Sequence, residues 1–280
     1  MRITDCHVHI SPIDEMRPES RALLARLDTD LVRALAVPAR FLELLDAAGV
    51  ERAVLINYVS PEVIGYTEKA NEFSGRYASA DPARLIAVGG IRPDHPDPRA
   101  ELRRMRADLG IRGLKLHPPH QLFFTNAYID GTHPGLAEIY RTCEELRLPV
   151  IFHTVTSVFP RARNRFGEPL AIEDVAVDFP DLPIVLAHAG RPLWMDQATF
   201  LARRFPNVWL ELSGIPPDRL LRYLPRLPEL GAKAIFGTDW PGPGVPDLGA
   251  NVRAFRALGL PSAVETAILE VNPRRVFPPA

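Results

Sequence analysis

Cysteine is scarce in this 280-residue sequence, which contains only Cys6 and Cys143. Two cysteines are too few for a disulfide framework, and a free cysteine usually behaves as a small buried apolar residue. No signal-peptide pattern precedes the first apolar run of the sequence. These observations predict a protein of a reduced, cytoplasmic compartment.

An excess of charge and a long apolar run are also missing. The chain has 33 basic and 34 acidic residues, a formal net charge of −1. This balance offers no basic surface for a phosphate backbone, so we expect no nucleic-acid partner. No run is apolar over enough residues to cross a bilayer, so we expect no membrane partner either. A small-molecule substrate is the remaining kind of partner.

Eight short apolar runs alternate with amphipathic segments along the chain. Several runs are almost continuous in aliphatic and β-branched residues, which favours strands buried on both faces of a parallel sheet. They predict one domain over residues 1–280, a (β/α)8 TIM barrel, with a doubly wound open sheet as the alternative. The expected strands are residues 2–10, 52–58, 85–93, 111–118, 148–154, 182–190, 207–214 and 233–241. The expected helical segments are residues 39–49, 133–147, 173–180, 194–206, 217–231 and 247–269.

Polar side chains gather near the C-terminal ends of these runs. The stretch DCHVHI places His7 and His9 on one face of a strand, because residues i and i+2 share a face. Taken alone, the pair fits surface histidines as well as a metal site. In both candidate folds, however, ligands bind where the strands end, so polar residues there would converge. Imidazoles and a carboxylate with room for water are typical of a catalytic metal site. The converging residues are His7, His9, His153, His188 and Asp239.

The sequence resembles the amidohydrolase superfamily, and specifically amidohydrolase family 2, which includes the aminocarboxymuconate-semialdehyde decarboxylases. The resemblance is carried by Asp-x-His-x-His at 5–9, GLKLHP at 113–118, FHT at 152–154, LAHAG at 186–190, FGTDWP at 236–241 and NPRRVF at 272–277. It spans essentially the whole chain. Each motif alone is weak, but the set is specific, and it implies a metal-dependent barrel enzyme.

The resemblance implies a role for each converging residue. His7, His9 and Asp239 would bind a divalent metal, with His153 as a further ligand. His188 would bind metal or hold the attacking water. Asp239 would also be the general base, because a cation lowers the pKa of water towards neutrality and a nearby carboxylate can then accept its proton. Zinc is the expected ion, and manganese is the alternative.

The number of metal ions depends on Lys115. Some superfamily members, including dihydroorotases, carboxylate a lysine in a similar setting, and the carbamate bridges two metals. Decarboxylases of the aminocarboxymuconate type use one metal and are not expected to have this lysine. Lys115 therefore favours a hydrolase. We expect one ion, with two as the alternative if Lys115 is carboxylated; otherwise Lys115 stays an ammonium that pairs with a carboxylate or contacts substrate.

Arginines after the fifth strand indicate an anionic substrate. Arg161, Arg163 and Arg165 would lie beside the metal, and guanidinium groups suit carboxylates or phosphates. The alternative is a solvated loop that pairs with Glu168 or Glu173. Three further candidates for substrate contact are Arg92, His117 and Trp240, although packing explains a tryptophan and a structural hydrogen bond explains a histidine equally well.

These features together predict a metal-dependent hydrolase of a small carbonyl compound: an amide, lactone, ester or activated β-keto compound. The first alternative is a metal-dependent, non-oxidative decarboxylase of an aromatic or dienoic acid on the same fold. The second is a barrel that binds a metal or ligand without turnover. Family members often pair, so a homodimer is one open assembly state.

Overall fold

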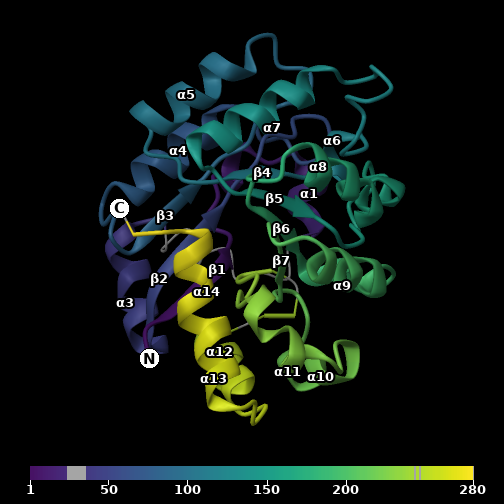
Figure 1. The fold of residues 1–280 in the computed structure, drawn as a ribbon. Helices are drawn as coiled ribbons and strands as arrows, with labels where there is room; N and C mark the ends of the chain where they lie inside the picture. The colour runs from purple at the N-terminus through teal and green to yellow at the C-terminus, as the bar shows by residue number, and fades with distance from the viewer. Residues whose placement is uncertain (24–35, 243, 246, 280) are drawn as a thin grey trace.

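The computed structural model describes residues 1–23, 36–242, 244–245 and 247–279. Eight strands, all paired in parallel, run through its centre (Figure 1). Seven of them lie within the apolar runs, and β2 begins two residues before the run at 52–58. The strands are β1 (Ile3–Val8), β2 (Val50–Ile56), β3 (Leu85–Val88), β4 (Leu114–Leu116), β5 (Val150–His153), β6 (Ile184–Ala187), β7 (Val208–Glu211) and β8 (Ala234–Ile235).

The strands form two sheets, β1-β2-β3 and β4-β5-β6-β7-β8, which are joined at both edges. At one edge Gly89 pairs with Leu114, and the Lys115 N–H donates to the Gly89 carbonyl at 2.7 Å. At the other edge Val8 pairs with Trp240. The strands therefore follow one another around a ring in chain order, which is the arrangement of a (β/α)8 barrel. The predicted barrel is confirmed, and the doubly wound open sheet is excluded.

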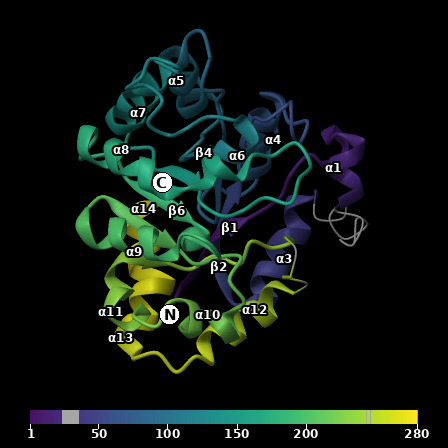
Figure 2. The same ribbon diagram turned by 90° about the vertical axis from the view of Figure 1, so that its right-hand side faces the viewer.

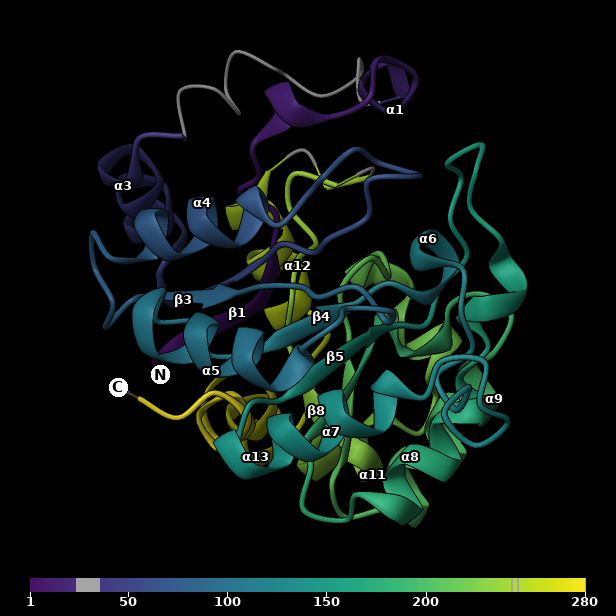
Figure 3. The ribbon, with the colours of Figure 1, turned by 90° about the horizontal axis from the view of Figure 1, so that it is seen from above.

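Helices surround this ring, as Figure 3 shows from above. Most connect one strand to the next. They are α1 (Pro18–Leu23), α3 (Pro38–Ala48), α4 (Lys69–Ala78), α5 (Pro98–Asp108), α6 (Pro118–Gln121), α7 (Gly135–Leu146), α8 (Ile172–Asp178), α9 (Met195–Arg204), α10 (Leu220–Tyr223), α11 (Leu227–Leu230), α12 (Leu248–Arg256), α13 (Ser262–Thr266) and α14 (Asn272–Val276). Within the described ranges, no helix is long and apolar enough to cross a membrane.

Two expected helices are broken in the structure. The segment 217–231 contains α10 and α11, with Pro225 between them and Pro228 in the first turn of α11. The segment 247–269 divides between α12 and α13 at Gly259, whose φ is +66°, and Pro261. Proline lacks an N–H and glycine readily takes a positive φ, so both residues end helices. Helices α4 and α5 were not among the expected segments.

The C-terminal segment covers one end of the barrel, in Figure 2 as in Figure 1. Phe277 packs with strand residues in a buried cluster, and its carbonyl accepts a hydrogen bond of 2.9 Å from Arg52 near the start of β2. A Cβ on Gly113, just before β4, would lie 3.3 Å from the Phe277 ring. The N-terminal ends of these strands are therefore occupied by packing. A binding cavity is therefore expected at the C-terminal ends of the strands.

Candidate metal centre

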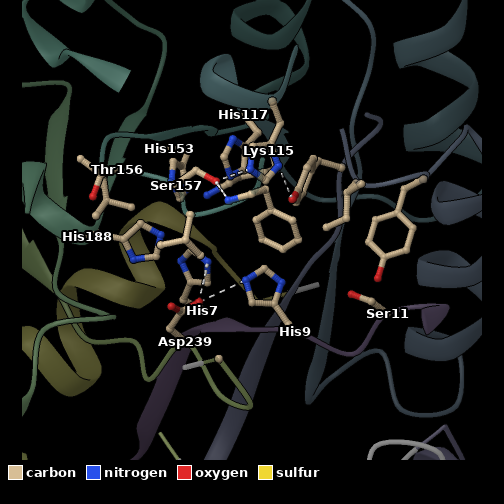
Figure 4. Close-up of a pocket in the computed structure, with 18 of the residues that line it drawn as sticks. His7, His9, Ser11, Lys115, His117, His153, Thr156, Ser157, His188 and Asp239 are labelled. Carbon is tan, nitrogen blue, oxygen red and sulfur yellow. Dashed lines mark hydrogen bonds and ion pairs between the residues drawn. The ribbon is translucent and has the colours of Figure 1, made fainter. Parts of the chain in front are cut away.

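A cavity of about 280 Å³ lies at the C-terminal ends of the strands (Figure 4). Its polar lining comes from strands on opposite sides of the ring, and its remaining wall is mostly apolar. The histidines and charged residues that line it are His7, His9, Lys115, His117, His120, His153, His188, Arg191 and Asp239. The sequence motifs that predicted a convergence of histidines thus meet in one space.

His7, His9 and Asp239 form one group of possible metal ligands. One atom from each lies within 4.8 Å of the others. Asp239 Oδ1 is 3.2 Å from His9 Nε2 and 3.7 Å from His7 Nε2. Figure 4 shows the three side chains facing one another. His7 Nε2 is buried and has no hydrogen-bond partner among the described residues. Because a buried polar atom without a partner is costly, this nitrogen is well suited to a ligand.

The imidazole tautomers follow from what each ring contacts on its other side. His9 Nδ1 is 3.0 Å from the Ile56 carbonyl, and His188 Nδ1 is 3.2 Å from the Ser213 carbonyl. A carbonyl only accepts, so Nδ1 donates in both rings. His7 Nδ1 likewise donates to Glu211 at 2.8 Å. All three rings therefore direct an Nε2 lone pair away from these contacts, as metal-binding histidines do.

Glu211 is a functional residue that the sequence analysis missed. It ends β7 and is fully buried, and burial raises the pKa of its carboxyl group. Besides His7, it accepts hydrogen bonds from the Ser213 hydroxyl at 2.7 Å and the Ser213 N–H at 2.6 Å. Ser213 in turn lies 3.0 Å from His188 Nδ1. Glu211 also forms a possible ligand group with His7 and His188, but its hydrogen bond to His7 assigns it to holding the ring in place.

The backbone around Asp239 and His188 is held in a rarely populated conformation. Both residues have a φ of +66°, in the left-handed region that non-glycine residues seldom adopt. Such strain persists where the surrounding structure enforces it, and it is frequent at functional sites. Asp5 contributes to this enforcement beside Asp239, since it accepts hydrogen bonds from the Thr238 N–H at 3.0 Å and the Thr238 hydroxyl at 2.7 Å.

Lys115 is buried in the same cavity with 1% of its surface exposed. Its Nζ has no hydrogen-bond partner among the described residues. Burial lowers the pKa of the amine to about 8, although the nearby carboxylates Glu211 and Asp239 act in the opposite direction. A substantial neutral fraction near pH 8 follows, and the neutral amine is the form that reacts with CO2.

The remaining histidines extend the cluster along one wall. His153 lies between His188 and His117, with ring centroids 4.9 and 3.7 Å away. His117 stacks on His120 at 3.6 Å, and His120 Nδ1 is 3.0 Å from the Tyr58 hydroxyl. The sequence analysis had left His120 out of the site. Burial lowers the pKa values of His117 and His153 well below their usual range and those of His120 and His188 to about 3, so these rings are neutral at pH 7.

The predicted substrate arginines lie elsewhere. Arg92 pairs with Glu62 at 2.8 Å and Asp94 at 2.9 Å. Arg161 lies 3.5 Å from Glu19, Arg163 contacts nearby backbone carbonyls, and Arg165 covers the Phe166 ring. None of the four lines the cavity that the described residues form, because partners at the surface hold their side chains. Contact of these arginines with a substrate stays a prediction, and the geometry of the cavity adds no support for it.

Trp240 is also placed differently from the prediction. It is 2% exposed, and its ring stacks on Phe41 with centroids 6.3 Å apart. It does not line the cavity formed by the described residues, so its position is explained by packing. Of the predicted substrate contacts, only His117 faces the cavity. Arg191, which the sequence analysis did not select, is the arginine found there.

A family model described as Amidohydrolase matches residues 4–278 of the sequence. The chain belongs to the amidohydrolase family. Members of the wider superfamily generally bind a divalent metal, and the donor set of this amidohydrolase fits one, because His7, His9 and Asp239 converge and the buried Nε2 of His7 has no hydrogen-bond partner among the described residues. No curated protein matches the chain significantly.

Solved structures share the amidohydrolase fold. An uncharacterised TIM-barrel protein from Bordetella bronchiseptica is 24% identical, with a TM-score of 0.75 over 99% of this chain and 98% of that one. The 5-carboxyvanillate decarboxylase of Sphingomonas paucimobilis is 18% identical, with a TM-score of 0.68 over 100% of both chains. A dihydroorotase from Campylobacter jejuni is 16% identical, with a TM-score of 0.60 over 99% of this chain and 83% of that one. These likenesses show the barrel fold.

Proposed function

We propose that this amidohydrolase is a metal-dependent hydrolase of a small carbonyl compound, such as an amide, lactone, ester or activated β-keto compound. The observation that carries the proposal is the unpaired Nε2 of His7 beside His9 and Asp239, in a cavity of a size that suits a small molecule. Zinc is the favoured ion for this set of imidazole and carboxylate donors, with manganese as the alternative.

When bound, the ion would lower the pKa of water and polarise the substrate carbonyl. The chain's own residues would do the rest. Burial opposes ionisation of Asp239, but His188, His9 and His7 together hold the pKa of its carboxyl group below the usual range. Asp239 is therefore a carboxylate at neutral pH, able to accept a proton at Oδ1 or Oδ2. His188, fixed through Nδ1, offers a neutral Nε2 that orients water or completes the ligand set.

We propose one metal ion, held by His7, His9 and Asp239 with His153 or His188 completing the set. Lys115 is the residue through which a second ion would be held, and only as a carbamate. The lowered pKa and unpaired Nζ of Lys115 are compatible with a free amine beside one ion and with a carbamate beside two ions. Metal analysis together with intact mass, where a carbamate adds the mass of one CO2, distinguishes the two states.

Substituting a ligand and the base separately tests the proposal. His7→Ala is expected to lose bound zinc and all activity, because it removes a ligand that no neighbour replaces. Asp239→Asn is expected to lower kcat by roughly 100- to 10,000-fold, the usual contribution of a general base. The measurements are metal content by mass spectrometry and turnover on a panel of amides, lactones, esters and β-keto compounds. If zinc- and manganese-loaded wild type turns over no compound, the hydrolase proposal is wrong.

A metal-dependent decarboxylase of an aromatic or dienoic acid is the second candidate. It is supported by the 5-carboxyvanillate decarboxylase structure, which this chain matches over its entire length. Labelled water separates the two reactions. A hydrolase incorporates ¹⁸O from water into its product, whereas a decarboxylase releases CO2 and takes a proton onto carbon. Release of CO2 without ¹⁸O incorporation would replace the first candidate by the second.

A further inference from the structure

Arg191 lines the cavity and its Nε is buried without a hydrogen-bond partner among the described residues. Other arginines with a buried unpaired nitrogen keep at least one partner. Arg52 donates to the Phe277 carbonyl at 2.9 Å, and Arg274 donates to Glu51 at 3.1 Å. Arg191 has no such contact within the described part of the chain. A permanently charged guanidinium that faces a cavity with unused donors is suited to an anionic ligand.

The charge of the cavity favours the same kind of ligand. Among its described lining residues, Asp239 is the single carboxylate, and its Oδ1 lies 3.2 Å from His9 Nε2. Arg191 and Lys115 are its basic side chains, while burial lowers the pKa values of five of the histidines that line it, His7, His117, His120, His153 and His188. A bound divalent ion would make the cavity more positive still. Among the described lining residues, basic side chains therefore outnumber carboxylates, which favours an anionic ligand.

The backbone at Arg191 is tied to the catalytic side of the cavity. The Arg191 N–H donates to the His188 carbonyl at 3.0 Å, which closes the short turn η4 (His188–Gly190) after β6. The Gly190 N–H donates to the Thr154 hydroxyl at 3.2 Å, next to His153. A group held by Arg191 is thereby positioned relative to His188 and His153, since all three lie on the ends of adjacent strands β5 and β6. Rigid positioning of this kind is what substrate anchors provide.

We propose that Arg191 binds a carboxylate of the substrate, so that the substrate class is small carboxylic acids whose reacting carbonyl lies at the His7, His9 and Asp239 group. This rests on the proposed function for the identity of the reacting group. A carboxylate fits because one guanidinium fork matches its two oxygens in a bidentate pair. The apolar side chains in the wall, including Ile13, Met16 and Phe159, suit the carbon skeleton of such an acid.

Calorimetric binding of matched probes tests this proposal. The full-length, zinc-loaded protein is titrated with benzoate, phthalate and succinate, and with the neutral amides benzamide and succinamide. Wild type is compared with Arg191→Met, Arg191→Lys and Arg163→Met, the last being an exposed arginine that contacts only backbone carbonyls. Each of these three variants is accepted only if its zinc content and circular dichroism spectrum match those of wild type. The same titrations on metal-free His7→Ala protein, with and without Arg191→Met, remove carboxylate binding to the metal from the comparison.

We expect Arg191→Met to weaken binding of at least one carboxylate roughly 10- to 100-fold, with the amides unchanged. Arg191→Lys should restore only part of the affinity, since lysine has no fork, and Arg163→Met should match wild type. The proposal is overturned if wild type binds none of the carboxylates, or if the loss in Arg191→Met is no larger than in Arg163→Met. If neutral carbonyl compounds are turned over equally well by wild type and Arg191→Met, the proposed carboxylate binding by Arg191 is overturned and the hydrolase proposal stands. Arg191-dependent carboxylate binding without any turnover overturns only the hydrolase proposal.

Discussion

At the scale of single residues, Glu211 connects the histidines of two strands. It fixes His7 directly and His188 through Ser213, so that both rings present Nε2 to the cavity. A fully buried carboxylate is stable there because N–H and O–H donors surround it. The position of the candidate ligands His7 and His188 therefore depends on Glu211, which is not part of the group His7, His9 and Asp239.

We expect Glu211→Gln to lower zinc affinity roughly 10- to 100-fold, the usual cost of losing the partner of a ligating histidine. The amide keeps the size of the side chain but accepts through one oxygen only. Zinc competition with a chromogenic chelator measures the change. Thr156→Ser, at the cavity wall, serves as a control that should keep wild-type affinity. Unchanged affinity in Glu211→Gln would show that the His7 ring is held by packing alone.

The candidate metal ligands could be named from the sequence, whereas the residues that hold their rings in place, and Arg191, could not. Histidines and an aspartate near the ends of apolar runs are conspicuous, because burial of such groups is costly without a purpose. Glu211 also lies in an apolar run, but a single carboxylate there has many explanations. Arg191 differs from Arg161, Arg163 and Arg165 only in where its loop directs it. That direction depends on contacts between strands far apart in the sequence.

At the scale of elements, the contact between β1 and β8 is short and relies on side chains. Only Val8 and Trp240 pair there, and the backbone adds a few hydrogen bonds around them. Asp5 strengthens this contact from β1, because its carboxylate accepts two hydrogen bonds from Thr238 and one of 3.1 Å from the His7 N–H. The hydrogen bonds of Asp5 thus help to close the ring between β1 and β8, where the strand pairing is short.

Asp5→Ala is expected to lower the free energy of unfolding by about 3 kcal/mol, since three buried donors lose their acceptor. Asp5→Asn should cost less, because one oxygen still accepts. Asp97→Ala is the comparison: it removes an exposed helix cap of α5, a change that costs about 1 kcal/mol. Urea unfolding measures all three. Equal losses for Asp5→Ala and Asp97→Ala would contradict a special role for Asp5 in closing the barrel.

All eight strands were predicted within a few residues because buried parallel strands are short, apolar and β-branched. The helices were predicted less well. Breaks at Pro225 and Pro261 were visible as prolines, but the apolar spacing on either side hid them. Helix α5 was missed because most of its residues are charged or polar, and only Leu102 and Met105 bury large apolar side chains. Its position is set by the strands it connects.

At the scale of the whole molecule, four buried histidines and the half-buried His153 are kept neutral at one end of the barrel. Burial lowers the pKa values of His7, His117, His120, His153 and His188. In the unfolded chain each would bind a proton near pH 6.5. Between that pH and about pH 3 the unfolded chain therefore binds more protons, and the folded state loses stability as the pH falls.

The metal-free protein should accordingly become less stable from about pH 6.5 downwards. Each histidine that stays neutral contributes up to about 1.4 kcal/mol per pH unit. Burial raises the pKa of Asp5 to about 7 and that of Glu211 as well, which offsets part of this slope. Urea unfolding at intervals between pH 5 and pH 8 measures the net effect. A free energy of unfolding that is constant or rises towards pH 5 would contradict this description of the cluster.

The division of the barrel into two sheets has a consequence for how the site comes into being. Sheet β1–β3 lies within residues 3–88, and sheet β4–β8 lies within residues 114–235. The first carries His7 and His9, and the second carries His153, His188 and Glu211, with Asp239 just beyond it. A chain cut between residues 89 and 113 would yield two pieces, each with an incomplete ligand set. Activity recovered on mixing them would report the reassembly of the whole ring.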